Sequence, residues 1–166
     1  GDIQAVLRPI LLDGLLGGGM PAAPKFKRPV NFLVSALRQL DADTDGGPAL
    51  HEYLAHMGQA YFGWPTPDGY PDHDAPWAGN LLPRWQFALA LARGEIKGTA
   101  LNLPLAAADA PETLADGLAR LLLGQPLPAA GRDGLLVSLR SAGALPAELP
   151  PILTAGLLAS PAFQWR

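Results

Sequence analysis

The sequence predicts an all-α fold, an orthogonal bundle of about six to seven short helices with one long ordered loop rich in proline, glycine and aromatic residues. Apolar residues recur three and four positions apart in segment after segment, as on the buried face of an amphipathic helix. Glycine and proline, 19 and 18 of the 166 residues, stand mainly between these segments, where helices begin and end. The exception is a dense Pro/Gly/Asp stretch over residues 63–80, which predicts the loop.

Length and composition limit the classes of protein to which this chain can belong. A chain of 166 residues, 49% of them hydrophobic, predicts one helical domain over 1–166 with a core of its own. The net charge is −3, and Lys25, Lys27 and Arg28 form the only basic cluster, so we expect no nucleic-acid binding. Cysteine is absent, which excludes disulfides and thiolate chemistry. No apolar run in the sequence is long enough to span a bilayer.

The first helix is expected from Ile3 to about Asp13, with Asp2 as its cap. Pro9 lies inside this segment and should kink the helix or displace its start, because proline has no backbone N–H. Residues 14–24 are rich in glycine and proline and predict a flexible linker.

Two further helices are expected before the loop. Pro29 suits the first position of a helix that runs to about Leu40. Residues 41–47 predict a turn, and the next helix should run from Pro48 to residue 61 or 62.

After the loop, Asn80 is expected to cap a helix that ends at Gly94, with Leu82, Trp85, Leu89 and Ala92 on one face. Residues 99–103 allow a short strand, for which the sequence shows no partner. Three more helices are expected at 109–124, 133–142 and 150–159, followed by a turn that opens at Ser160.

The loop over 63–80 contains four prolines, so neither a helix nor a central strand can run through it. Its aromatic residues carry too much apolar surface to remain in water, and disordered segments are poor in such residues. We therefore predict an ordered loop whose aromatic side chains anchor it to the flanking helices.

The same loop offers a candidate metal site at Asp68, Asp72, His73 and Asp74. Clustered carboxylates suit a hard cation such as Ca²⁺, and carboxylates with an imidazole suit a transition metal. The spacing is not that of an EF-hand. The alternative is that these are ordinary solvated turn residues, so the sequence leaves the cofactor unknown.

The ligand-binding candidates are Trp64, Tyr70, Trp77 and Arg84. The three rings would form a stacking platform for a sugar, and the guanidinium would hold a carboxylate by two hydrogen bonds. The favoured alternative is structural: the rings anchor the loop, and Arg84 bonds Asp72, Asp74 or loop carbonyls.

No catalytic residue is assigned. Glu52 and His56 share a helix face, and such a pair is more often a surface contact than an acid–base pair. No nucleophile elbow and no phosphate-binding glycine loop is present in the sequence, so whether the protein is an enzyme stays open.

Three stretches, in order, resemble an uncharacterised bacterial family catalogued as domain of unknown function 1800. They are KRPVNFLVSALR from Lys27, the block from Met57 to Ala88 with its GYP and LLPRWQFA segments, and LLASPAFQ from Leu157. The start GDIQAVL also fits, whereas Pro9, the glycines at 17–19 and Tyr70 depart from the pattern. The resemblance implies that this chain is the C-terminal third of a longer, exported protein.

Two functions are compatible with these observations. The first is a non-catalytic helical scaffold or interaction module, whose partner is the N-terminal region of the same protein. The alternative is that loop 63–80 with Arg84 forms part of a ligand, metal or active site of an exported hydrolase acting on glycans or their esters. The resemblance implies a periplasmic or secreted location and a second, sulfatase-like partner protein.

Overall fold

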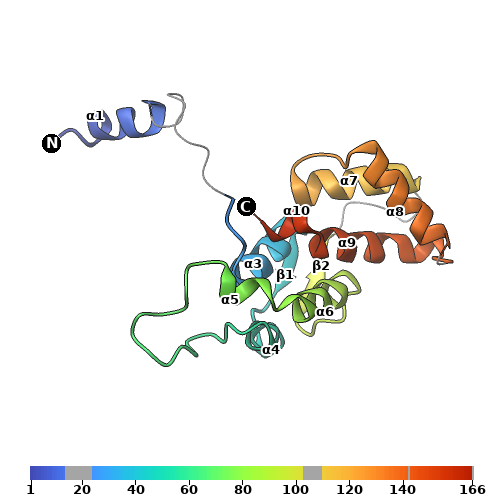
Figure 1. Ribbon diagram of the computed structural model, residues 1–166, viewed down its shortest axis with the longest axis horizontal. Helices are drawn as coiled ribbons and strands as arrows, with labels where there is room; N and C mark the ends of the chain where they lie inside the picture. Colours follow the sequence, from blue (N-terminus) through green and yellow to red (C-terminus); the bar gives the residue numbers. More distant parts are fainter. Residues whose placement is uncertain (14–23, 103–109, 142, 166) are drawn as a thin grey trace.

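The computed structural model describes residues 1–13, 24–102, 110–141 and 143–165, which form a mostly helical fold with one small sheet (Figure 1). The predicted linker at 14–24 lies almost wholly outside the described residues. The helices are α1 (Ile3–Arg8), the π-helical turn η1 (Pro9–Asp13), α3 (Pro29–Gln39), α4 (Pro48–His56), α5 (Ala75–Ala78), α6 (Leu81–Ala92), α7 (Pro111–Leu123), α8 (Ala129–Ser141), the 3₁₀ turn η2 (Pro146–Glu148), α9 (Leu149–Ala159) and α10 (Pro161–Gln164).

The sheet corrects the all-α prediction. Strand β1 (Ala42–Thr44) pairs antiparallel with β2 (Thr99–Leu101), in a register that sets Asp43 opposite Ala100. The hydroxyls of Thr44 and Thr99 are 2.8 Å apart and hydrogen-bond across the pair. Residues 41–47, which were expected to form a turn, therefore contain the strand that pairs with the short strand β2. A three-residue strand has too short a pattern to predict, and its partner lies far along the chain.

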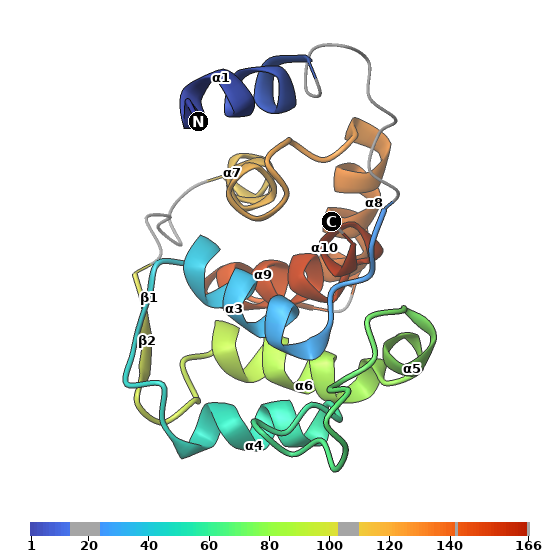
Figure 2. The same cartoon turned by 90° about the vertical axis from the view of Figure 1, so that its left-hand side faces the viewer.

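The core lies between α6 and α9, which pack side by side, with α3 and α7 around them (Figure 2). Its side chains are aliphatic and aromatic, and Phe32 meets both Phe87 and Phe163 edge to face. Helix α6 buries the face that carries Phe87 and Leu91. The face expected to carry its apolar stripe, with Leu82 and Trp85, is instead largely exposed.

The N-terminal helix forms as expected but stands apart from the core (Figures 1 and 2). Asp2 caps it, accepting hydrogen bonds from the backbone N–H groups of Gln4 and Ala5. At Pro9 the α-helix gives way to the π-helical turn, because proline cannot donate the next backbone hydrogen bond. None of the residues of α1 is buried.

A four-residue helix, α5, forms within the loop over 63–80, where no helix was expected, because Pro76 lies in its first turn, where no backbone N–H is needed. Two helix boundaries also differ from the expectation. Helix α4 ends at His56 rather than at residue 61 or 62, because Gly58 follows with a φ of +87°, a left-handed value that ends the helix. Helix α8 begins at Ala129, ahead of the expected 133. Within the described part of the chain, no helix is long and apolar enough to cross a membrane.

Candidate ligand site at the aromatic loop

The loop is joined to the body by a chain of aromatic contacts that begins at α5. Trp77 on α5 is only 4% exposed, and its indole N–H donates to the carbonyl of Pro71 over 3.1 Å. The ring centroid of Tyr70 lies 5.9 Å from Trp77 and 4.9 Å from Trp64. The Tyr70 hydroxyl donates to the carbonyl of Ala60 over 2.7 Å. The three predicted ligand-binding rings are thus brought together, with Trp77 enclosed and Trp64 partly exposed.

Asn80, the last residue of the loop, joins the start of α6 to the end of α4. Asn80 occupies the N-cap position of α6, as expected, but its side chain does not bond the helix. Its amide nitrogen instead donates to the carbonyl of His56, the last residue of α4, over 3.1 Å. This contact satisfies a carbonyl at the end of α4 and fixes the distance between the two helices.

Arg84 lies in the interior, not on the loop surface. Its side chain is fully buried, and its guanidinium donates to Gln164 Oε1 over 2.8 Å and to the carbonyl of Lys27 over 2.7 Å. It also stacks on the rings of Phe26 and Phe32, at 4.6 and 5.1 Å from their centroids. Burial lowers the pKa of Arg84 to about 10. These hydrogen bonds join α6 to the segment before α3 and to the C-terminal helix, rather than to Asp72 or Asp74.

Two of the four residues of the predicted metal site, Asp68 and Asp72, bond to separate partners. Asp68 accepts hydrogen bonds from the Thr66 hydroxyl and from the indole of Trp64, which lower the pKa of its carboxyl. Asp72 forms ion pairs with Lys25 (2.9 Å) and Arg28 (3.5 Å).

His73 is exposed, and Asp74 is half-buried at the start of α5. Across the described ranges, no three acidic, histidine or cysteine side chains are grouped so that they could hold a metal ion. The metal site at Asp68, Asp72, His73 and Asp74 stays a prediction, without geometric support in this part of the chain.

Two aromatic residues that the sequence predicts to be buried, Tyr61 on the helix before the loop and Phe62 as a loop anchor, are instead exposed. Phe62 is 92% exposed and Tyr61 is 61% exposed, because α4 ends before them and they leave its buried face. With Tyr70 and Val30 they line a small cavity of about 160 Å³ beside the loop. Gly58, a glycine just inside the expected end of a helix, was the available signal for this early end.

The other candidate pair, Glu52 and His56, is exposed on α4. Glu52 lines a shallow cavity of about 480 Å³ with His51 and Tyr61, whose rings lie 5.7 Å apart. No hydrogen bond joins this group into an acid–base pair within the contacts that the structure describes.

These observations define a mostly helical protein whose aromatic loop is held by interior contacts and whose surface retains large apolar side chains. A family model described as "Protein of unknown function (DUF1800)" matches residues 1–165, and the chain belongs to this family. No curated protein and no solved structure is significantly similar to the chain.

Proposed function

We propose that the chain is a non-catalytic helical interaction module that docks onto another protein surface through exposed apolar side chains. The observation that carries this proposal is the apolar face of the N-terminal helix. The partner we propose is the N-terminal region of the same, longer protein.

The N-terminal helix presents its apolar residues to solvent. Ile3, Val6 and Leu7 of α1 are 74%, 61% and 44% exposed, and Ile10 and Leu11 of the adjoining turn η1 are 62% and 52% exposed. A helix this short is marginal in water and gains most of its stability from packing an apolar face. A contiguous apolar face of this kind marks an interaction surface.

A second apolar surface lies on α6. Leu82, Trp85 and Leu89 follow one another at intervals of three and four residues, and they are 62%, 48% and 36% exposed. Aromatic residues are enriched at protein interfaces, where a large rigid side chain contributes most of the contact energy. This stripe would give a partner protein a second place to dock.

The cellular context of the proposal follows from the family resemblance alone. We propose that the longer protein is exported to the periplasm or beyond and meets a sulfatase-like partner there. Fractionation of cells that express the full-length protein tests the location directly.

The glycan-site alternative draws on Trp64 and Tyr70. Their rings are in contact, and the Trp64 indole is held by Asp68. Trp77 and Arg84, which complete the predicted set, do not present their side chains to solvent. The loop surface therefore supports this alternative less well than the apolar faces support docking.

A matched pair of substitutions on the N-terminal helix tests the proposal. Val6→Asp places a charge within the apolar face, whereas Ala5→Asp places the same charge on the opposite side of the helix. We expect the chain to self-associate in sedimentation velocity, with Val6→Asp abolishing the association and Ala5→Asp retaining it.

The two variants are then tested for binding to a separately produced N-terminal region. We expect Val6→Asp to abolish this binding and Ala5→Asp to retain it. A chain that stays monomeric at high concentration and binds no N-terminal region would contradict the proposal.

A further inference from the structure

Phe62 is 92% exposed, the largest exposed fraction among the bulky apolar side chains of the described residues. Its φ is +53°, a left-handed value that residues other than glycine rarely adopt. Backbone strain of this kind concentrates at functional sites. We propose that Phe62 is an interaction anchor for a short segment of a partner protein that carries one large apolar side chain beside a lysine or arginine. This surface involves neither α1 nor the apolar stripe of α6.

A hydrogen-bonded turn over residues 60–63 holds Phe62 in this position. The carbonyl of Ala60 accepts the backbone N–H of Gly63 over 3.0 Å and the hydroxyl of Tyr70 over 2.7 Å. Residue 63 has to be a glycine, because a Cβ atom there would lie 2.8 Å from the Cβ of Ala60 and 3.1 Å from the Tyr70 hydroxyl. Tyr61 and Phe62 occupy the centre of the turn, and their ring centroids are 4.7 Å apart. The turn therefore presents both rings to solvent.

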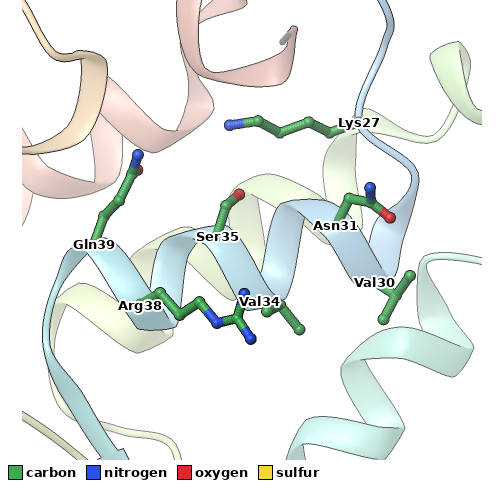
Figure 3. Close-up of a pocket in the computed structure, with 7 residues that line it drawn as sticks. All are labelled: Lys27, Val30, Asn31, Val34, Ser35, Arg38 and Gln39. Carbon is green, nitrogen blue, oxygen red and sulfur yellow. The ribbon is translucent and has the colours of Figure 1, made fainter. Parts of the chain in front are cut away.

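The cavity of about 160 Å³ beside Phe62 has room for one apolar side chain. No charged side chain lines it; its lining residues are Val30, Gln59, Ala60, Tyr61, Phe62 and Tyr70. The wall is already bonded, because the Oε1 atom of Gln59 accepts the backbone N–H of Val30 over 2.9 Å. Figure 3 shows Val30 on the first turn of α3, pointing away from Lys27. An apolar cavity of about 150 Å³ can hold a benzene ring, so the side chain of a phenylalanine or leucine fits here.

The shallow cavity of about 480 Å³ adjoins the first, since Ala60 and Tyr61 line both. With histidine neutral, Glu52 is the one charged residue among those that line it. A third cavity of about 390 Å³ shares Glu52 and adds Asp45 and Lys97, so two carboxylates face one ammonium. Glu52 takes part in none of the ion pairs between described residues. The charge beside the apolar cavity therefore favours a cationic group on the partner.

An apolar cavity of one side chain's size next to an acidic cavity matches a short stretch of polypeptide. Side chains that enter pockets carry most of the binding energy at protein interfaces, and charges around them fix orientation and speed association. The partner's apolar side chain fills the 160 Å³ cavity and packs on Phe62, and its cation lies over Glu52. Because the walls of the cavity are bonded before the partner arrives, little ordering is needed on binding.

The test is selection of a phage library of random heptapeptides against the full chain, followed by fluorescence polarisation with an enriched peptide. We expect enriched peptides to carry a phenylalanine, tryptophan or leucine close to a lysine or arginine. Phe62→Ala should weaken binding at least about thirtyfold, as the loss of an anchor does. Leu145→Ala removes another exposed apolar side chain and should leave binding unchanged. Glu52→Gln should weaken binding about threefold to fivefold, as for an exposed ion pair, whereas Glu95→Gln should have no effect.

Phe62→Gly separates an anchor from a residue that supports the fold. Glycine adopts a φ of +53° without strain, so the melting temperature should stay the same or rise while peptide binding is lost. A clear fall in melting temperature would overturn the proposal.

Three results of the selection would also overturn it: no enrichment, enrichment of acidic peptides, or equal binding of an enriched peptide by Phe62→Ala and the unsubstituted chain. Val6→Asp, which tests the docking of α1, should bind the peptide normally, so failure of the proposed function and failure of this proposal can be told apart.

Discussion

Arg84 shows at the scale of one residue how this fold is held together. A buried guanidinium without a carboxylate partner is costly, and here two carbonyl oxygens and two aromatic rings stabilise it. Burial lowers the pKa of Arg84 from the ordinary value of arginine to about 10. At pH values between these two pKa values, the folded protein binds fewer protons than the unfolded chain. The free-energy cost of burying the charge is therefore complete at neutral pH and declines only as the pH rises above about 10.

Replacing Arg84 by methionine tests this role. Arg84→Met leaves the buried acceptors Gln164 Oε1 and the carbonyl of Lys27 without their donors. We expect the free energy of unfolding to fall by about 3 kcal/mol, as it does when buried acceptors lose their partners. Urea unfolding measures this, with Arg120→Met as a control that should change stability by less than about 1 kcal/mol. Equal stability of the two variants would contradict the interior role of Arg84.

At the scale of an element, the short helix α5 holds the loop. Four residues cannot form a stable helix alone, so α5 depends on the burial of Trp77. The ring of Tyr70 packs on Trp77, and the ring of Trp64 packs on Tyr70, so the outer part of the loop is held through Trp77. The exposed fraction of these tryptophans rises from 4% at Trp77 to 37% at Trp64, so their contributions to stability should differ.

Alanine substitutions of the two tryptophans test whether Trp77 contributes more to stability than Trp64. Trp77→Ala should lower the free energy of unfolding by about 3–5 kcal/mol, the usual cost of removing a buried aromatic side chain. Trp64→Ala should cost about 1 kcal/mol, because much of its ring is already in water. Urea unfolding gives both values, and limited proteolysis should cut residues 60–74 faster in Trp77→Ala. Similar costs for the two variants would show that α5 is not the anchor.

At the scale of the whole molecule, the two ends of the chain differ in how far their side chains are buried. The C-terminal segment closes the core: Phe163 and Gln164 are buried, and the ring of Trp165 meets Phe26 edge to face at 5.3 Å. The N-terminal helix contributes no buried residue. Tolerance to truncation follows the burial of the affected segment rather than its position in the sequence.

Deletions at the two ends should therefore have opposite outcomes. Removal of residues 161–166 takes away Phe163 and the hydrogen bond from Arg84 to Gln164, and we expect a loss of at least about 4 kcal/mol or failure to fold. Removal of residues 1–23 should change stability by less than about 0.5 kcal/mol. Urea unfolding of both proteins measures this. A large loss on removing residues 1–23 would show that α1 packs on the body and is not a free docking surface.

The features that the sequence predicted correctly depend on neighbouring residues. Asp2 caps α1, and Gly94 and Gly124 end α6 and α7 with φ values of +69° and +74°, because glycine alone adopts these values without strain. The clustering of Trp64, Tyr70 and Trp77 was also predictable, because all three lie in one short proline-rich loop.

The features that the sequence did not predict depend on residues far apart. The stripe of Leu82, Trp85 and Leu89 is as apolar as the buried face of α6, so composition could not decide which side packs. The partners of Arg84 lie 57 and 80 residues away in the chain, which no local pattern reports.

The sequence by itself determined the helices, most of their ends and the aromatic loop, because backbone preferences and apolar periodicity act over a few residues. Only the tertiary structure decided which face of α6 is buried, what Arg84 bonds and that two distant segments form a sheet. These depend on the competition among all apolar faces for one core, and the outcome of that competition is fixed by the packing of the whole chain.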